Sequence, residues 1–304
     1  MMNPGLNARG SLYYSMKNKV LILLMSCNQP LYDEEEQACR DTFLKDAEEA
    51  GVSYYFYKGL DGTHSASCID EEAHTIYIDV SDGLGGTAKK TALALEMTGD
   101  KDYDYVLKTN VSTYLNINNI AKAVDEWEGA EDDNIYGGRF IINQASKNIP
   151  FPRGYFTLVS KKLVSGALPF MKKLAWVSQM PKTDDTLLGL SLLYYIKKGL
   201  EKDYMGSLNI VPSVISWRDD IWENPGLLNA LAVRCKNENA LEKTPDNMRA
   251  VDRVVKEKTE PKKYRMPAEQ FETPYGLMSY NNHLKIDKII TELNKMAEKE
   301  NAQK

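Results

Sequence analysis

The sequence lacks a long hydrophobic run, an excess of positive charge and any clustering of metal-binding residues. Its most apolar run, Val20–Met25, is far shorter than the roughly 20 residues that cross a bilayer, and it is not a convincing signal peptide. The formal net charge of −5 argues against nucleic acid as the main partner, because phosphate binding favours a basic surface. We therefore expect no nucleic-acid partner, no integral membrane segment and a cytoplasmic location, with peripheral membrane association as the alternative.

Cysteine and histidine are scarce and scattered. The cysteines have no C-x-x-C spacing, so neither a zinc site nor a disulfide framework is indicated, and we predict reduced thiols. The histidines lack the spacing of metal ligands, and we interpret them as structural or exposed. These residues are Cys27, Cys39, Cys68, Cys235, His64, His74 and His283.

Strand-like and helix-like segments alternate in the first half of the 304-residue chain. Continuous apolar runs predict buried strands, because parallel strands covered by helices are apolar on both faces. This order predicts an α/β fold with a Rossmann-like, mostly parallel sheet and helices on both faces, whose ligands bind at the carboxyl ends of the strands. The predicted strands are 19–26, 52–59, 74–80 and 104–108, and the predicted helices are 32–50, 87–97 and 117–127.

The second half is more mixed. We predict strands at 134–140 and 155–160, a helix at 184–199, and loops and helices after Trp217, including a helix that begins at Thr244–Pro245. The tail from His283 carries one apolar stripe at helical spacing, which permits a homo-oligomer. The predicted organisation is a flexible arm (1–16), a main domain (17–235) and a C-terminal helical extension (236–304).

A glycine-rich segment, Asp82–Thr91, leads into the predicted helix 87–97. It does not match the phosphate-binding P-loop, because Ala88 stands where that pattern needs its second glycine. We interpret the glycines as a loop that turns into a helix. Lys90 differs, because a lysine in the first turns of a helix near a strand end can reach a diphosphate.

Asp184 and Asp185 stand at the start of the predicted helix 184–199. Adjacent acids at this position commonly cap the helix by accepting backbone N–H bonds. The alternative is that one carboxylate caps while the other acts as a general base. Asn110 and Ser112 also have two interpretations, as turn residues after the strand 104–108 or as ligand-binding residues.

Seven short segments follow one another between about Val20 and Leu200. They are LILLMSC; Arg40, Thr42 and Phe43; YIDVSDGLGGTAKKTALALEM with the pair Lys90–Thr91; VLKT followed by NVSTYLN; YGG; GYFTLVS; and DDTLLG. In this order they resemble the motifs of the β-1,3-galactosyltransferase and fringe-like glycosyltransferases, which have the GT-A fold. Two departures stand out: the stretch between YGG and GYFTLVS is shorter, and Asn110, Val111 and Ser112 replace the metal-binding acids.

The resemblance implies transfer of a hexose from a nucleotide sugar, with UDP-sugar as our choice, to a hydroxyl of a glycan or lipid-linked glycan, as in polysaccharide biosynthesis. The implied mechanism is one inverting displacement with Asp185 as the base and Asp184 as the alternative. Mg²⁺ and Mn²⁺ prefer anionic oxygens, which Asn110 and Ser112 do not supply. We therefore expect metal-independent catalysis without a cofactor, with Mn²⁺ as the alternative. Cationic side chains would then hold the diphosphate, and the candidates are Lys90, Lys108, Arg139, Arg153 and Arg218.

The predicted site has a donor side and an acceptor side. The donor-binding residues are Ser26 and Cys27 beside the uridine, together with Lys90, Lys108, Asn110 and Ser112. The acceptor-binding residues are Arg153, Gly154, Tyr155 and Trp217. A catalytically inactive sugar- or nucleotide-binding scaffold shares all these features and is the main alternative. A sugar nucleotidyltransferase fits less well, because MSCNQP lacks the Gly-rich, Arg-containing loop of that class, and a P-loop phosphotransferase fails on the spacing.

Overall fold

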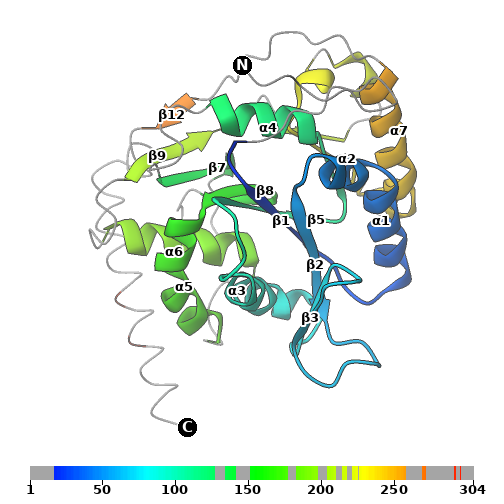
Figure 1. Ribbon diagram of the computed structural model, residues 1–304. Helices are drawn as coiled ribbons and strands as arrows, with labels where there is room; N and C mark the ends of the chain where they lie inside the picture. The colour runs from blue at the N-terminus through cyan, green and yellow to red at the C-terminus, as the bar shows by residue number, and fades with distance from the viewer. Residues whose placement is uncertain are drawn as a thin grey trace.

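The computed structural model describes residues 17–126, 134–141, 151–176, 183–197, 204–209, 214–217, 221–224, 226–257, 269–271, 291 and 295. Within these ranges the centre of the molecule is a nine-stranded sheet (Figure 1). Its spatial order is β12 (Glu269–Phe271), β9 (Tyr204–Asn209), β7 (Asn134–Ile141), β8 (Phe151–Ser160), β5 (Tyr105–Asn110), β1 (Val20–Met25), β2 (Ser53–Gly59), β4 (Thr75–Ile78) and β3 (Cys68–Asp70).

Most of the longer strands run in one direction. The neighbours β4, β2, β1 and β5 are parallel, and so are β7 and β9. Strand β8 is antiparallel to both β5 and β7, so β7 and β9 share the direction of β5. The short edge strands β3 and β12 are antiparallel to their neighbours. The predicted α/β class with a mostly parallel sheet is confirmed.

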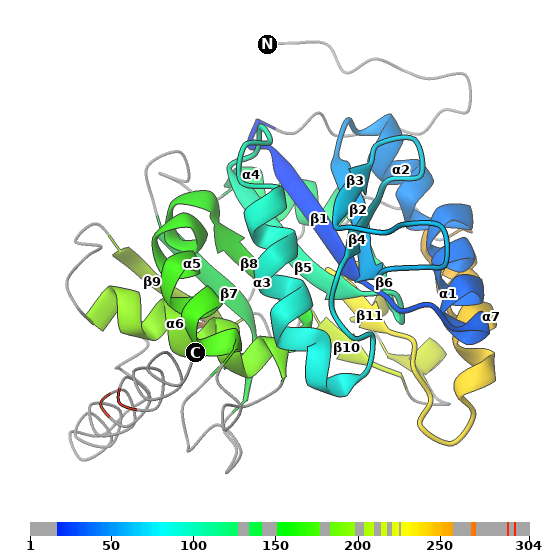
Figure 2. The same ribbon diagram turned by 90° about the horizontal axis from the view of Figure 1, so that it is seen from below.

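Helices cover both faces of the sheet, as Figures 1 and 2 show. One face carries α1 (Pro30–Asp41), α2 (Phe43–Glu49), α4 (Ile117–Glu126) and α7 (Thr244–Glu257), and the other carries α3 (Thr87–Met97), α5 (Lys161–Ala175) and α6 (Asp184–Lys197). The apolar run of β1 is continuous because both faces of this strand are buried. Ile22 and Leu24 pack into the core of the first face, while Leu21 and Leu23 pack into the core of the second.

The structure corrects the prediction of one helix over 32–50. The segment forms two helices that meet at Thr42, whose φ of −115° and ψ of −112° are not helical. The Thr42 hydroxyl donates to the carbonyl of Ala38 at 2.6 Å, and this kind of local side-chain bond competes with regular helix geometry. The predicted helices 87–97, 117–127 and 184–199 correspond to α3, α4 and α6, and the side chain of Asn116 accepts the Asn119 N–H at 3.1 Å at the start of α4.

Helix α5 was not predicted. It contains Gly166 and Pro169, and both residue types weaken the helical signal of a sequence. Packing accounts for Gly166, because a Cβ at this position would lie 2.1 Å from Cζ of Tyr195 on α6. The close approach of α5 and α6 therefore compensates for poor helix propensity.

A second, three-stranded sheet was also not predicted. It has the order β10 (Val214–Ser216), β11 (Ala232–Arg234) and β6 (Thr113–Leu115). Strand β11 lies where the sequence predicted only loops and helices. Its main-chain bonds to β6 connect the C-terminal part of the chain to the turn that follows β5.

The helix predicted from Thr244–Pro245 is α7. Met248 and Val251 of this helix belong to the same core as β1, and Arg249 forms an ion pair with Asp41 of α1 at 3.2 Å. The proposed domain boundary at 235 stays a prediction. Almost all of the tail from His283 lies outside the described residues, as does the arm 1–16. No helix in the described part of the chain is long and apolar enough to cross a membrane.

Candidate functional site

The carboxyl ends of β1, β2 and β5 lie side by side. In the parallel register Met25 pairs with both Tyr57 of β2 and Asn110 of β5. The N–H of Ser26 donates to the Tyr57 carbonyl at 3.0 Å, and the N–H of Val111 donates to the Met25 carbonyl at 3.2 Å. Asn110 at the end of β5 and the first residues after β1 and β5, which include Ser26, Cys27 and Ser112, therefore lie along one rim of the sheet.

Lys108 connects three distant parts of the sequence. Its side chain is 1% exposed, donates to the Gly154 carbonyl at 3.0 Å and forms an ion pair with the carboxylate of Asp184. Burial lowers the pKa of Lys108 to about 8, and the negative charge of Asp185 opposes this shift. Strand β5, strand β8 and the first turn of α6 therefore converge on one buried ammonium group.

The two acids of α6 have different surroundings. Asp184 is 6% exposed and serves as the charge partner of Lys108. Asp185 is half-buried, and its Oδ2 accepts the N–H of Gly154 at 3.1 Å while its Oδ1 accepts the N–H of Thr186 at 2.8 Å. A carboxylate has about four acceptor positions, so Asp185 retains capacity for a further proton donor.

Lys90 is held by the protein itself. Its side chain is 1% exposed, and its Nζ donates to the Ser26 carbonyl at 3.0 Å and to Oδ1 of Asp82 at 2.5 Å. Asp82 also accepts the N–H groups of Gly59 at 2.8 Å and Asn28 at 2.7 Å. Lys90 thus lies at the expected rim, but its charge is already balanced by a carboxylate. Its predicted contact with a diphosphate stays a prediction.

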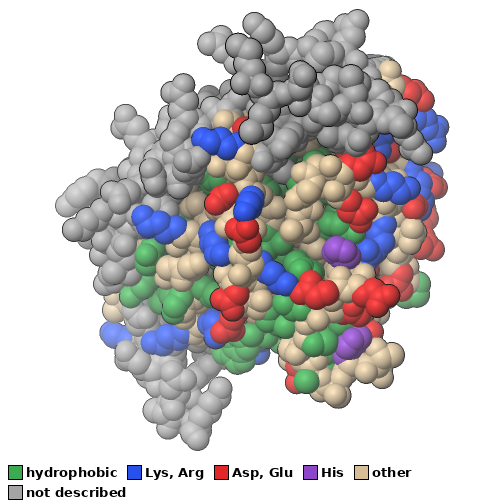
Figure 3. Space-filling view, viewed as in Figure 1, with side chains coloured by type: hydrophobic (Ala, Val, Ile, Leu, Met, Phe, Trp, Pro, Cys, Tyr) green, Lys and Arg blue, Asp and Glu red, His purple; other side chains and the backbone are tan. Residues whose placement is uncertain are grey.

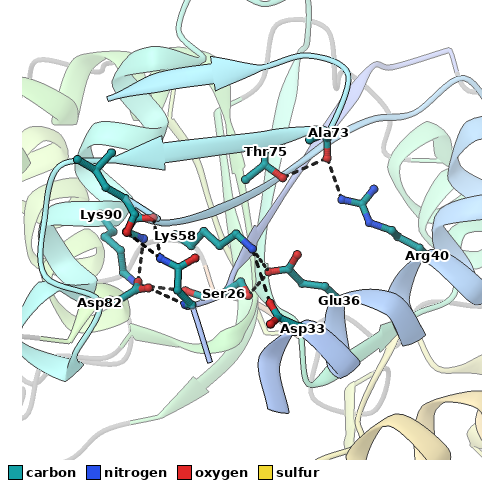
Figure 4. Close-up of polar contacts among 12 residues, drawn as sticks. Ser26, Asp33, Glu36, Arg40, Lys58, Ala73, Thr75, Asp82 and Lys90 are labelled. Carbon is teal, nitrogen blue, oxygen red and sulfur yellow. Dashed lines mark hydrogen bonds and ion pairs between the residues drawn. The ribbon is translucent and has the colours of Figure 1, made fainter. Parts of the chain in front are cut away.

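A second buried ion pair lies between the ends of β1 and β2 (Figure 4). Glu36 of α1 accepts the Ser26 hydroxyl at 2.5 Å and the Lys58 ammonium at 3.0 Å, and both charged residues are 8% exposed. Asp33 lies further from the same ammonium group, at 3.9 Å. The Ser26 hydroxyl is therefore oriented by Glu36, and its carbonyl is bound by Lys90.

Sequence reasoning missed Glu36, Lys58 and Asp82. Glu36 stands within a run of acids on an amphipathic helix and Lys58 stands at the end of a strand, and charged residues in such positions are commonly solvated. The available signal was the position of Lys58 and Asp82 at the carboxyl ends of β2 and β4. On the face of the molecule drawn in Figure 3, acidic and basic side chains are interspersed.

Cys27 and the other cysteines are free thiols. Burial raises the pKa of Cys27 to about 11, so its thiol is neutral at physiological pH. His64 stacks on Tyr77 with ring centroids 3.7 Å apart, and His74 stacks on Tyr54 at 4.6 Å. These contacts agree with the structural interpretation of both histidines.

Asn110 and Ser112 form a small network at the end of β5. The Oδ1 of Asn110 accepts the hydroxyls of Ser112 at 2.8 Å and Thr113 at 2.9 Å. These bonds fix the turn that leads from β5 into β6, which supports the interpretation as turn residues. Among the described residues no group of three or more His, Cys, Asp and Glu side chains is placed to hold a metal ion.

The predicted acceptor residues lie on two sides of the rim. The Gly154 carbonyl accepts the Lys108 ammonium, and the Tyr155 carbonyl accepts the Thr109 hydroxyl at 2.7 Å. Arg153 precedes them on β8, and Trp217 follows β10 and packs edge-to-face on Trp222 with centroids 5.6 Å apart. Arg139 donates to the hydroxyl of Ser216 at 3.3 Å. Arg218 lies outside the described residues.

Comparisons with known proteins give little further information. No protein-family model and no curated protein sequence matches the chain. Among solved structures the chain is similar to the galactosyltransferase LgtC in complex with donor and acceptor sugar analogues. The sequence identity is 12%, the match covers 81% of this chain and 99% of that chain, and the TM-score is 0.42. At this TM-score the likeness supports no conclusion about individual residues or activity.

Proposed function

We propose that this protein is a glycosyltransferase of the GT-A type that moves a hexose from a nucleotide sugar to a glycan hydroxyl. The main support for this proposal is that Lys108, Gly154 and the acids Asp184 and Asp185 meet at one point of the sheet rim. These residues come from three of the segments that carry the sequence resemblance. The donor in this proposal is a UDP-sugar, and the acceptor is a soluble or lipid-linked glycan.

The proposed reaction is one displacement with inversion at the anomeric carbon. The acceptor oxygen forms a bond to that carbon while the bond from the carbon to the diphosphate oxygen breaks, and its electron pair leaves with the nucleoside diphosphate. Asp185 takes the proton of the acceptor hydroxyl. Asp184 has a different part in this proposal, because its ion pair with Lys108 keeps the start of α6 against β8 and fixes the direction of the Asp185 carboxylate.

The nucleoside lies at the ends of β1 and β2 in this proposal. Ser26 has its hydroxyl and its carbonyl fixed by Glu36 and Lys90, which makes it a preorganised contact for a base or ribose. Lys90 and Lys58 act by holding the rim in shape, since both ammonium groups already have carboxylate partners. Stabilisation of charge on the leaving diphosphate then needs further cationic donors.

Transfer and hydrolysis assays with a panel of nucleotide sugars test the function. Wild type is expected to release the nucleoside diphosphate, and Asp185→Asn is expected to lose at least about 100-fold in kcat, as for the loss of a general base, with its melting temperature lowered by no more than about 2–4 °C. If wild type raises its melting temperature with UDP-sugars but shows no turnover with any acceptor or water, the protein is the inactive binding domain instead.

The metal requirement has its own assay. We expect the rate in EDTA to equal the rate with Mn²⁺, because the turn after β5 offers an amide and a hydroxyl where a bound Mg²⁺ or Mn²⁺ prefers carboxylates. Loss of activity in EDTA that Mn²⁺ restores refutes metal independence and leaves the transferase function standing.

A further inference from the structure

The small sheet brings a row of polar side chains to the end of β5. In the order β10–β11–β6, Ser216 pairs with Arg234, and Arg234 pairs with Thr113. Directly paired residues place their side chains on the same face of a sheet. Ser216, Arg234 and Thr113 therefore form one row, and Arg234 is its central member.

Each end of this row is bonded to the main sheet. Thr113 donates to the side chain of Asn110 at 2.9 Å, and Ser216 accepts from Arg139 of β7 at 3.3 Å. In the middle, the Arg234 guanidinium lies 5.4 Å from the centre of the Tyr155 ring. The face of the small sheet that carries Arg234 is thus turned towards the rim formed by β5, β8 and β7.

Three hydrogen-bond donors at this junction have no partner within the described part of the chain. They are the hydroxyl of Tyr155, the indole Nε1 of Trp217 and the Nε of Arg234, and all three atoms are buried. Tyr155 as a whole is only 3% exposed, and Trp217 is joined to Arg234 by a main-chain bond of 2.8 Å. Buried polar groups without a partner are costly, so this grouping of donors points to a ligand with several acceptor atoms.

The charge at the junction favours an anion. Among the described residues the Arg234 guanidinium is the cation that lies over the Tyr155 ring. This guanidinium has one described carboxylate contact, with Glu238 at 3.0 Å, and the Glu238 side chain is 66% exposed. Solvent screens such an exposed pair, so it neutralises the guanidinium weakly. A guanidinium with free donors matches phosphate oxygens in a two-point geometry.

We propose that Arg234, Tyr155 and Trp217 bind the diphosphate of the nucleotide donor. The assignment of the anion to a nucleotide rests on the proposed function. Asn110 supplies the connection, because it pairs with Met25, next to Ser26, and is bonded to the Thr113 end of the row. A nucleotide whose nucleoside lies at Ser26 would extend its phosphates past Asn110 to Arg234, whose guanidinium would supply positive charge to the diphosphate.

Calorimetric titrations of the full chain in EDTA with UDP, uridine and pyrophosphate test the assignment. Arg234→Gln is expected to lose about 10- to 100-fold in affinity for UDP and pyrophosphate, as for a bond to a charged group, while uridine binds as to wild type. Tyr155→Phe and Trp217→Phe remove one donor each and should lose several-fold for the same two ligands. Arg253→Gln, on an exposed position of α7, is the matched control and should change nothing.

The outcomes separate this inference from the proposed function. If Arg234→Gln and Tyr155→Phe both bind UDP and pyrophosphate as wild type does, the inference is wrong, even where transfer still depends on Asp185. A raised KM for an acidic acceptor with an unchanged UDP affinity also overturns it, because the anion then belongs to the acceptor. If pyrophosphate binding depends on Arg234 but UDP binds no more tightly than pyrophosphate, the anion site stands and the nucleotide-sugar function fails.

Discussion

The ion pair between Lys108 and Asp184 predicts a large and pH-dependent loss of stability in Asp184→Asn. Both side chains are buried, with 1% and 9% of their surfaces exposed. Without its partner Lys108 has no carboxylate in contact, and the lowest cost is reached by giving up its proton. In the folded wild type the pKa of Lys108 is about 8, so removing its proton at pH 7 costs about 1.4 kcal/mol for the one pH unit between the two values. The lost contact between the two buried side chains adds to this cost, since mutations that break buried pairs in other proteins cost about 3–5 kcal/mol.

The stability lost in Asp184→Asn should decrease as the pH rises. In Asp184→Asn the unfolded state binds a proton at Lys108 up to about pH 10.5 and the folded state does not, so stability rises with pH by about 1.4 kcal/mol per unit. Wild-type Lys108, with its pKa of about 8, is itself mostly deprotonated at pH 9, so the loss relative to wild type should shrink by about 1.4 kcal/mol between pH 7 and pH 9. Urea unfolding of both proteins, followed by fluorescence and circular dichroism at each pH, measures this difference.

Two variants serve as controls. Asp185→Asn removes the same charge from the neighbouring half-buried position and should cost about 1 kcal/mol or less, because the amide oxygen still accepts the Gly154 N–H. Lys108→Met combined with Asp184→Leu removes both charges and should be more stable than either single change. A loss below about 1 kcal/mol for Asp184→Asn at pH 7, or a loss that does not change with pH, contradicts the buried ion pair.

The remaining predictions concern Glu35 and the loop before α3. Burial raises the pKa of Glu35 to about 7, so between pH 4.5 and 7 the folded state binds more protons than the unfolded state and this residue lowers stability as pH rises. Glu35→Gln should therefore stabilise the protein above pH 7 by on the order of 2–3 kcal/mol and leave it unchanged near pH 4, and equal stabilisation at both pH values refutes the shift. Gly86→Ala should destabilise by about 1–3 kcal/mol, because its Cβ would lie 1.8 Å from the Ser81 carbonyl oxygen. Gly83→Ala has 3.7 Å of room at its nearest contact and is the matched control; similar melting temperatures for the two variants count against the tight loop.

The sequence predicted most of the first half of the fold because its elements are set by local pattern. The run in β1 is apolar on both faces, α3 is rich in good helix formers, and α4 begins at the polar cap Asn116, so local preference and packing agree. Thr42 shows the limit. The break between α1 and α2 is accompanied by one hydrogen bond from the Thr42 side chain to the Ala38 carbonyl. The hydrophobic periodicity of the segment continues across this position, so it does not predict the break.

The elements that sequence reasoning missed depend on partners far along the chain. Helix α5 forms despite Gly166 and Pro169 because α6 packs closely on it. Strands β6 and β11 are three residues each and pair with one another across more than 100 positions. Segments this short have no periodic signal of their own, so only the folded chain defines them.

The candidate site was predictable where chemistry follows strand ends. The ends of β1 and β5 were identified from the sequence, and the structure brings Ser26, Asn110 and Lys108 to one rim. The pairing of charges was not predictable, because Lys90–Asp82 and Lys58–Glu36 join different helices and loops. Arg234 was missed for the same reason, since its strand reaches the rim only through β6.

The pairing of β6 with β11 also has a consequence for the order in which the molecule acquires its structure. Closing that contact encloses a loop of more than 100 residues, a step that folds slowly because its entropy is lost before its bonds form. In the turn after β5 the Ser112 carbonyl accepts the Cys235 N–H at 2.9 Å, and after β6 the Asn116 N–H donates to the Leu231 carbonyl at 2.9 Å. A nascent chain whose residues 231–235 are still within the ribosome could therefore have α1 to α6 and the central strands, but it would lack α7 and the hydrogen bonds that hold this rim.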